Sequence, residues 1–506
     1  MGKLKGVVIG SGFGGLAAAI RLQASGVQVT LLEQRETIGG RAGQIKDSGY
    51  TFDTGPSLVT ATEIIDSVFQ HAGTTLRESV DLVPLDPFYR VHFYDGTFID
   101  YSGDVEDMER QMAVFNKSDA QNYRRFLNDI KPVFDAVITD GLGAMPFDNL
   151  KTFAAFVPRA LKLKAYKTVA GYAADYFDDF RHQFMFSFHP LFIGGNPFYS
   201  PALYVMIPYL EKEQGVWYIQ GGMYELVKAM ASVLVDLGGI IRTATPADEI
   251  IVKDGKAVGV RSGDEIIDAD LVVSNADLVR TYTNLLSSVD RKKWTDKRLD
   301  KLKQSMSCFL LYLGVRQEYP ELKHHTLMIA ERYRELLEDI FRRKILADDF
   351  SLYLHVPSRT DRTMAPEGGE SLYILAPVPN LRSGTDWDQA AGPLRDKIVK
   401  YLEEWGLKDL EASIEVEHMF TPADFETELL AEAGNAFGIE PILTQSAYFR
   451  PHNRSEDVDN LYFVGAGTHP GAGIPGVLLS AEATMKSIRE DHHLETPILR
   501  DPVIVQ

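Results

Sequence analysis

Four glycines near the N-terminus, in the run Gly10-Ser11-Gly12-Phe13-Gly14-Gly15, have the spacing of a phosphate-binding turn. Gly10 allows a tight turn, Gly12 lets the backbone approach a pyrophosphate, and Gly15 lets a helix pack closely on a strand. The free N–H groups at the start of that helix attract the phosphate charge. An acid follows at Glu33, about where such sites bind an adenosine ribose hydroxyl. Together these residues predict a dinucleotide site.

The elements around these residues support the same interpretation. Residues 7–9 and 27–32 are apolar and predict two buried strands, and residues 16–24 predict the helix between them. The glycine pattern alone is a weak signal, because a glycine-rich turn without a ligand has the same letters. Strand, glycines, helix, strand and terminal acid in this order predict a βαβ unit that binds a dinucleotide.

Composition limits the other possibilities. The chain has 506 residues, of which 45% are hydrophobic and 24% charged, as expected for a globular protein of two or three domains. A formal charge of −19 argues against a nucleic-acid partner, since phosphates would be repelled. The single cysteine, Cys308, excludes an internal disulfide and a metal site built on cysteines. No unbroken apolar segment reaches about 18 residues, so we expect no transmembrane helix.

The order of patterns predicts a domain interrupted by insertions. From about residue 60 the pattern is mostly helical, with mixed turns around 81–100, and residues 240–273 are β-rich with a hairpin turn at 253–256. A further insertion carries strand character at 353–379. We expect a discontinuous nucleotide-binding domain at 1–70, 215–285 and 433–490, a second domain at 71–214 and 286–432, and a flexible tail at 491–506.

A basic segment stands out in this acidic chain. Between Asp148 and Asp175 there is no acidic residue, while basic and apolar side chains alternate: Lys151, Phe153, Phe156, Arg159, Leu161, Lys162, Leu163, Lys164, Tyr166, Lys167 and Val169. The pattern fits an interfacial helix lying on anionic lipid, and equally a solvated basic helix whose apolar face packs on the core. Pro158 is expected to bend this helix or to split it.

Two further segments invite a functional interpretation. Residues 184–210 contain no charged side chain but many aromatic ones, and four prolines with Gly194-Gly195 forbid a spanning helix. Such a segment suits the wall of an apolar cavity, although an ordinary core is the more frequent explanation. The pair His324-His325 has no third ligand at helical or loop spacing, so we expect a structural role and no metal site.

Several motifs resemble one family of flavoproteins. The spacing from Glu33 to Gly39-Gly40-Arg41 is similar to that of FAD-containing amine oxidases and carotenoid desaturases, and residues 460–476 (NLYFVGAGTHPGAGIPG) resemble the closing motif of bacterial and fungal-type phytoene desaturases. Further matching motifs extend the resemblance along nearly the whole chain: Gly194-Gly195-Asn196-Pro197, Gly215-Val216-Trp217, 349–355 (DFSLYLH), Ala376-Pro377-Val378-Pro379 and 443–454 (LTQSAYFRPHNR).

The resemblance implies a fold and a set of cofactor residues. It implies an α/β protein of amine oxidase/GDI-like architecture, with a Rossmann-like FAD-binding domain, a mixed α+β substrate domain and an inserted helical, membrane-docking part. Arg41 would lie beside the cofactor phosphates, and the helix after the closing turn would point its N-terminus at the flavin. His469 is expected near the cofactor, and no catalytic residue is assigned. The expected cofactor-binding residues are Gly10, Gly12, Gly14, Gly15, Glu33, Gly40, Arg41, Gly55, Gly465, Gly467, Thr468, His469, Gly471, Gly473 and Ile474.

The resemblance also implies an activity. We expect FAD-dependent desaturation of phytoene toward lycopene or neurosporene, by hydride transfer to flavin, with partly desaturated carotenes as further substrates and a quinone or oxygen as electron acceptor. The expected location is peripheral, on the cytoplasmic side of the cell membrane. One alternative is a carotene isomerase, or a desaturase of modified or shorter carotenes. The other is a prenyl-binding protein without flavin, similar to Rab GDP-dissociation inhibitors, which the intact glycine motifs argue against.

Overall fold

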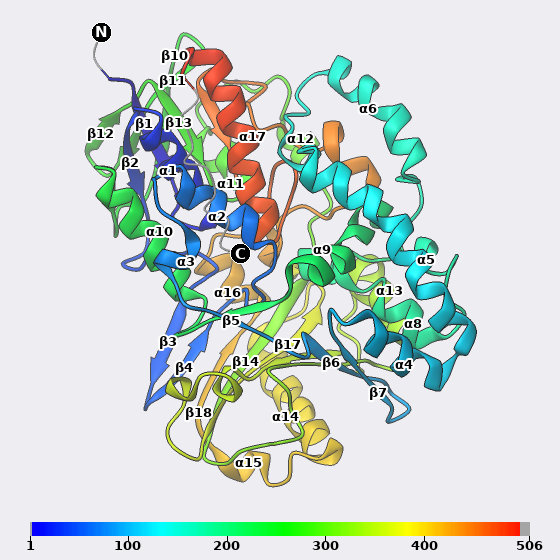
Figure 1. The fold of residues 1–506 in the computed structure, drawn as a ribbon. Coiled ribbons are helices and arrows are strands. Elements are labelled where there is room, and N and C mark those ends of the chain that lie inside the picture. The colour runs from blue at the N-terminus through cyan, green and yellow to red at the C-terminus, as the bar shows by residue number, and fades with distance from the viewer. Residues whose placement is uncertain (1–2, 496–506) are drawn as a thin grey trace.

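The protein, described here as a computed structural model covering residues 3–495, is built around two large β-sheets (Figure 1). The first is a five-stranded parallel sheet whose strands are mostly buried, as expected for a sheet covered on both faces. Helix α1 (Phe13–Ala24) packs against α10 (Tyr224–Asp236) and α17 (Ile474–His492). The strand order is β19 (Leu461–Phe463), β13 (Leu271–Ser274), β1 (Lys5–Ile9), β2 (Gln28–Leu32) and β9 (Ile240–Arg242).

These five strands come from the three segments expected to form the nucleotide domain, while the exact domain boundaries stay a prediction. Beside them lies a three-stranded antiparallel sheet of β10 (Glu249–Lys253), β11 (Lys256–Ser262) and β12 (Glu265–Asp268). The predicted hairpin turn is confirmed, because Asp254 and Gly255 connect β10 to β11 with φ of +50° and +78°. Positive φ at both central residues matches the twist of the strands.

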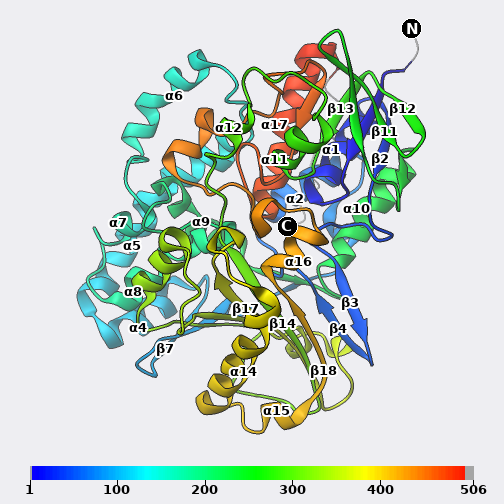
Figure 2. The same cartoon turned by 180° about the vertical axis from the view of Figure 1, so that it is seen from behind.

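The second large sheet has seven strands. Its strand β14 (Ser307–Val315) alternates between two environments: Phe309 and Leu311 pack with Trp387 of α14 (Trp387–Trp405), whereas Leu310 and Tyr312 belong to the core on the other face. Both views show α14 under this sheet (Figures 1 and 2). The strand order is β18 (Ile414–Phe420), β14 (Ser307–Val315), β17 (Glu370–Val378), β16 (Leu352–His355), β15 (His325–Met328), β6 (Tyr89–His92) and β7 (Phe98–Tyr101).

Strands β6 and β7 correct the sequence analysis, which placed mixed turns at 81–100. Each has only four residues, and β6 joins the sheet by parallel pairing with β15, more than two hundred residues away in sequence. Two small antiparallel pairs complete the strands: β3 (Gln44–Asp47) with β4 (Tyr50–Asp53), and β5 (Leu82–Pro84) with β8 (Trp217–Ile219).

Most of the remaining helices belong to the two insertions into the nucleotide domain. In the first insertion they are α2 (Thr62–Gln70), α3 (Leu76–Ser79), α4 (Val105–Phe115), α5 (Lys117–Phe134), α6 (Leu150–Lys162), α7 (Val169–Ala173), α8 (Phe180–Met185) and α9 (Ile207–Gln214). In the second, besides α14, they are α11 (Leu278–Arg280), α12 (Asp296–Leu299), α13 (Tyr333–Glu338), α15 (Leu410–Ser413) and α16 (Pro422–Thr427). No helix among residues 3–495 is long and apolar enough to cross a membrane.

Helix α6 contains the basic segment up to Lys162 and lies at the outer edge of the molecule in both views (Figures 1 and 2). None of its residues is buried. Pro158 lies inside the continuous helix α6, so it does not split this helix, while the expected bend stays a prediction. At the other end of the chain, α17 reaches His492, and Asp491 accepts hydrogen bonds from Arg454 and Tyr462. The flexible tail therefore cannot begin at 491, and residues 496–506 lie outside the described part.

The close packing of α1 on β1 gives a stability prediction. A Cβ at Gly15 would overlap the carbonyl oxygen of Gly10 and approach the Cβ of Asn275 to 3.2 Å. We expect Gly15→Ala to lower the free energy of unfolding by about 1–3 kcal/mol or more, since backbone cannot move aside cheaply. Gly392→Ala is the control, because a Cβ there meets no atom within 4 Å and alanine favours its helix. Equal urea midpoints for parent and Gly15→Ala would contradict the packing argument.

Candidate active site

A cavity of about 1300 Å³ joins the glycine turns of the parallel sheet to the open face of the seven-stranded sheet. Ordinary ligand pockets measure about 300–1,000 Å³, so this cavity has room for a dinucleotide and a second ligand. Its nucleotide end is lined by Gly10, Gly12, Gly14, Glu33, Gly40, Arg41, Gly55, Gly465, Gly467, Gly473 and Ile474. The structure therefore brings together most of the residues predicted from the two motifs. Gly15, Thr468, His469 and Gly471 do not line the cavity.

The opening turn presents backbone N–H groups to this cavity. Gly10 has φ of +90°, and its N–H donates to the Leu32 carbonyl at 2.8 Å, which ties the turn to β2. Helix α1 begins after Gly12, and no side chain caps it. A Cβ on Gly12 would lie 3.0 Å from the Asn275 amide and otherwise meet nothing closer than 3.9 Å. The uncapped N-terminus and the bare Cα of Gly12 thus fit a pyrophosphate.

Glu33 is fixed at the end of β2 by three donors. One carboxylate oxygen accepts from the Ser11 N–H at 3.0 Å and from the Ser11 hydroxyl at 2.5 Å, and the other accepts from the Arg35 N–H at 3.0 Å. The Ser11 hydroxyl in turn accepts from the Gly39 N–H at 3.0 Å. Ser11 was not predicted as a site residue, although its place between two motif glycines was a usable signal. The carboxylate is buried but still lines the cavity, as a ribose partner must.

Arg41 has an unsatisfied group that an anion would satisfy. Its guanidinium donates to the backbone and side-chain oxygens of Asn435 at 3.3 and 3.4 Å, but its Nε is buried without a hydrogen-bond partner among the described residues. Burial lowers the pKa of Arg41, and Asp277 opposes that shift. A Cβ at Gly55 would overlap the Arg41 carbonyl, so this glycine holds the two segments together. The buried, incompletely paired cation fits a cofactor phosphate.

The closing turn divides into residues that face the cavity and residues that hold them. The Thr468 hydroxyl donates to the Pro451 carbonyl at 2.7 Å, and the Arg450 guanidinium donates to the carbonyls of Thr468 and Ala466 at 2.8 and 2.5 Å. His469 packs on Phe147, with 5.0 Å between ring centroids, and burial lowers its pKa to about 3. These residues support the turn from behind.

Helix α17 starts directly at the cavity. Gly473 has φ of +86° and is followed by Ile474 and Pro475, and no side chain caps the helix. Its free N–H groups and the positive end of its dipole therefore face the space where a flavin ring would acquire negative charge on reduction.

Asn275, at the end of β13, links the two turns and was missed. Its side chain approaches the Gly10 carbonyl at 3.5 Å, and a Cβ at Gly14 or Gly465 would lie 2.6 or 2.7 Å from its amide oxygen. The carboxyl ends of parallel strands are where such sheets bind ligands, which could have identified the residue.

The far end of the cavity is apolar and aromatic. Tyr312 and Tyr373 are cross-strand neighbours on the open face of the seven-stranded sheet. The uncharged segment 184–210 supplies the opposite wall through Phe184, Phe188, Leu191, Phe192, Ile193, Tyr204, Met206, Ile207 and Leu210. The cavity-wall interpretation of this segment therefore describes it better than an ordinary core.

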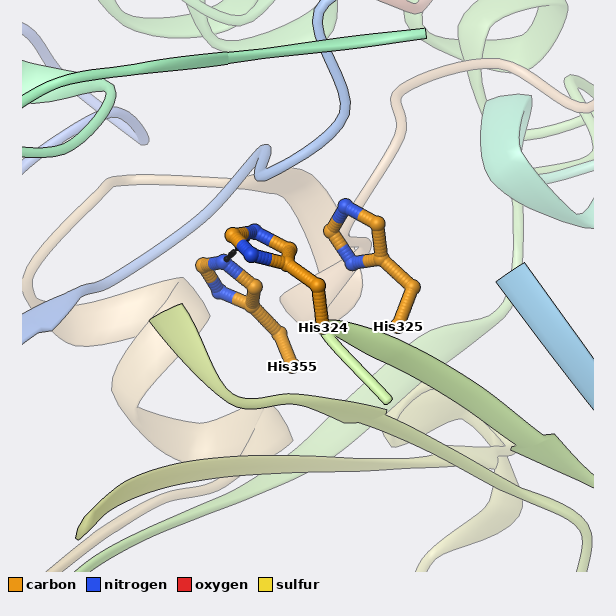
Figure 3. Close-up of side chains that lie close together, drawn as sticks. All are labelled: His324, His325 and His355. Carbon is orange, nitrogen blue, oxygen red and sulfur yellow. Dashed lines mark hydrogen bonds between the residues drawn. The ribbon is translucent and has the colours of Figure 1, made fainter. Parts of the chain in front are cut away.

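Three histidines lie together beside this cavity (Figure 3). The third histidine, His355, does not stand at helical or loop spacing in the sequence; the pairing of β15 with β16 places it opposite His325. The Nε2 atoms of His324 and His355 are 3.2 Å apart, and Tyr353 contacts His325 Nδ1 at 2.7 Å. Burial lowers the pKa of all three.

The spacing of the ring nitrogens can be compared with that of a zinc site. The candidate ligand atoms of the three rings lie within 4.8 Å of one another, and the rings of His325 and His355 are stacked at 24°. Neighbouring nitrogens around a tetrahedral zinc with bonds of about 2.0–2.1 Å lie roughly 3.3 Å apart, and the His324–His355 pair has about this separation. The absence of a metal site stays a prediction.

Comparison with known proteins gives consistent matches. A family model described as flavin containing amine oxidoreductase matches residues 13–484. A lycopene-forming phytoene desaturase of Pseudescherichia vulneris is 46% identical over 96% of this chain and 99% of its own length. A neurosporene-forming phytoene desaturase of Rhodobacter capsulatus is 41% identical over 97% of this chain and 95% of its own.

Solved structures show the same fold at low sequence identity. An oxidoreductase from Methanosarcina mazei aligns with a TM-score of 0.63 at 18% identity, covering 96% of this chain and all of its own. Cyclohexylamine oxidase from Brevibacterium oxydans aligns with a TM-score of 0.60 at 15% identity, covering 97% of this chain and all of its own. The expected amine-oxidase architecture is confirmed.

The position of Glu33 gives a binding prediction. Glu33→Ala removes a charge-assisted hydrogen bond worth roughly 1.5–3 kcal/mol and leaves the buried Ser11 N–H without its acceptor, so FAD should bind about tenfold more weakly or worse. Titration of the apoprotein with FAD measures this. Glu36→Ala, an exposed carboxylate three residues further on, is the control. Equal affinity in parent and Glu33→Ala would show that Glu33 does not contact the ribose.

Proposed function

Because this chain belongs to the flavin containing amine oxidoreductase family, we propose that it is an FAD-dependent enzyme that desaturates phytoene toward lycopene or neurosporene. The observation that carries this proposal is the continuous cavity, whose nucleotide end has the features of an FAD site and whose far end is a long apolar chamber. Relatives that are 41–46% identical over nearly the whole chain form one or other of these two products.

The residues of this chain have positioning and solvent-excluding roles. Bound FAD supplies the acceptor for a hydride from the substrate. The glycine turns, Glu33 and Arg41 would hold the nucleotide, and the N-terminus of α17 would stabilise negative charge on the reduced flavin. The aromatic walls fix an elongated hydrocarbon and exclude water, so much of the rate enhancement comes from orientation.

The insolubility of the substrate supports a membrane-bound route of access. Moving a forty-carbon hydrocarbon from lipid into water costs about 0.8 kcal/mol per methylene-sized group, or roughly 30 kcal/mol in total. The enzyme must therefore take its substrate from a bilayer. Helix α6 is the favoured docking element, because Leu161 and the nearby Tyr166 are 58% and 60% exposed among basic side chains.

Helix α6 is also connected to the cavity. Its Phe156 packs on Phe147, and Phe147 packs on His469 of the closing turn, with ring centroids 5.4 and 5.0 Å apart. Val137 and Gly143, on the segment leading to α6, line the cavity. Docking through α6 would thus bring the cavity wall close to the lipid.

The proposed function also includes a cellular location, an electron acceptor and a division into domains. A peripheral position on the cytoplasmic side of the cell membrane suits an acidic protein with one basic face, and a quinone or oxygen would reoxidise the flavin. The cofactor domain would comprise 1–70, 215–285 and 433–490, and the substrate domain 71–214 and 286–432. Membership of a flavin-containing family argues against the flavin-free prenyl-binding alternative.

Product analysis tests the activity. Purified protein incubated with FAD and phytoene in liposomes should convert phytoene to carotenes with two or more additional double bonds, resolved by chromatography. An isomerase would give products of unchanged mass. Unchanged phytoene in the presence of flavin-loaded protein would contradict the proposal.

A charge reversal tests the docking face. Among the basic residues, Arg159 is paired with Asp140 and Lys167 with Asp175, which leaves Lys151, Lys162 and Lys164 for lipid contact. Replacing these three by Glu should weaken binding to anionic liposomes by several kcal/mol, at roughly 1 kcal/mol per charge, with FAD content unchanged. Lys253, Lys256 and Lys400 replaced by Glu form the control, with the same charge change at exposed sites on β10, β11 and α14. Equal flotation of both variants would place the docking face elsewhere.

A further inference from the structure

A carboxylate lies in the apolar part of the cavity. Glu211 follows the uncharged segment 184–210, belongs to α9 and is 1% exposed. It lines the cavity together with Ile207 and Leu210 of the same helix and with Phe188 and Phe192 across from it. Helix α9 lies between the two large sheets in both views (Figures 1 and 2). Keeping an ionised group in such surroundings is costly, and a hydrocarbon has no need of a polar partner.

The partners of Glu211 are a tyrosine and a histidine. The hydroxyl of Tyr89 donates to one carboxylate oxygen at 2.8 Å, and His189 Nε2 lies 3.2 Å from the same oxygen and 3.0 Å from the Tyr89 hydroxyl. Among the described residues, no arginine or lysine pairs with Glu211. Burial and the charge of Glu211 raise the pKa of Tyr89 well above its usual range, so this hydroxyl stays a donor. The second carboxylate oxygen has no hydrogen bond to the described residues.

One short element connects Glu211 to the closing turn. His189 is the first residue of the 3₁₀ helix η3 (His189–Ile193), and Ile193 is its last. Ile193 packs on Gly473, where an added Cβ would lie 3.0 Å from Ile193 Cγ2. Four residue steps of a 3₁₀ helix span about 8 Å. The Glu211 carboxylate is therefore separated from the start of α17 by roughly the length of η3, and both lie on the wall of the same cavity.

The other carboxylates of the cavity are at its nucleotide end. They are Glu33, Asp248, Asp277 and Glu428. Glu33 holds Ser11, Asp277 caps α11, and Glu428 lies beside Gln34, whose side chain donates to its carbonyl at 3.4 Å. The hydroxyl of Tyr353 also lines the cavity, but it is engaged with Ser57 and His325. Glu211 is thus the carboxylate placed beside an apolar substrate.

We propose that Glu211 is the catalytic residue that accepts the proton released from the carotene, with Tyr89 and His189 as the residues that position its carboxylate. The proposal rests on the desaturase function and names its missing base. One hydrogen leaves the substrate with its bonding electrons, as a hydride accepted by FAD. The neighbouring carbon loses a proton to Glu211, the electrons of that C–H bond form the new double bond, and Glu211 becomes a neutral carboxylic acid. Before the proton leaves, the carboxylate stabilises positive charge on the substrate.

An isosteric variant tests this role. Glu211→Gln keeps the size of the side chain and removes its basicity, so kcat should fall at least 100-fold, within the range typical of a lost general base, while KM, FAD content and binding of lycopene in detergent stay within about twofold of the parent. Glu213→Gln is the control, since Glu213 lies on the same helix but is 46% exposed and pairs with Lys212. It should retain the parent rate.

A rescue experiment separates chemistry from structure. Glu211→Ala leaves space beside the substrate, and added formate should restore turnover at least tenfold, with no effect on Glu213→Gln. If Glu211→Gln does not load FAD, Glu211→Asp decides, because a retracted carboxylate should lower kcat at least tenfold with KM unchanged. The role of Glu211 would be overturned by an unchanged kcat in Glu211→Gln, or by an absence of rescue by formate. If Glu211→Gln does not load FAD, an unchanged kcat in Glu211→Asp would overturn it instead. Failure of the parent and of Glu213→Gln to desaturate phytoene would instead refute the proposed function.

Discussion

The contact of the Asn275 amide with two glycine turns is the constraint on which the site depends. The parallel order β19-β13-β1 brings the carboxyl ends of three strands together, and Asn275 follows the middle one, β13. Its backbone N–H donates to the Ile9 carbonyl at 2.8 Å, and its side chain occupies space that a Cβ at Gly14 or Gly465 would need. Because Gly14 and Gly465 have no side chains, both turns can lie against Asn275, and this contact sets the distance between α1 and α17. The N-termini of these two helices point into one cavity.

The rest of the architecture follows from joining this nucleotide end to an apolar chamber. The period-two alternation of β14 sends Leu310 and Tyr312 toward the cavity and Leu311 toward α14, so one sheet has both a packed face and a face available to substrate. The segment 184–210 closes the chamber, and Glu211 brings the first charge after it. In the apolar part of the cavity, the buried carboxylate of Glu211 would accept the proton while FAD accepts the hydride, so the two leave toward different groups.

Local patterns could be read from the sequence, and tertiary pairings could not. Gly10, Gly12 and Glu33 lie within one short βαβ unit, and Asp254-Gly255 is a turn with its own backbone requirement, so neighbouring residues alone predict them. Strands β6 and β7 are four residues long and gain their pairing from β15, far away in the chain. His355 joins His324 for the same reason, and Asn275 meets the glycines only through sheet order. The sequence leaves open whether Pro158 bends or splits its helix, because the effect of a proline depends on how the turn before it accommodates the lost hydrogen bond, and the structure shows one continuous helix.

The central claim is that one cavity brings a carotene chain to bound FAD, and the most direct measurement is the anaerobic reduction of that flavin by phytoene. Flavin-loaded protein on liposomes, mixed with phytoene without an electron acceptor, should lose its oxidised flavin absorption band in a single turnover. The amount of newly formed double bonds should equal the amount of reduced flavin. Hydride transfer from the carotene to FAD would be contradicted by product formation without loss of the oxidised flavin band. It would also be contradicted if the flavin of fully loaded protein stayed oxidised in the presence of membrane-embedded phytoene.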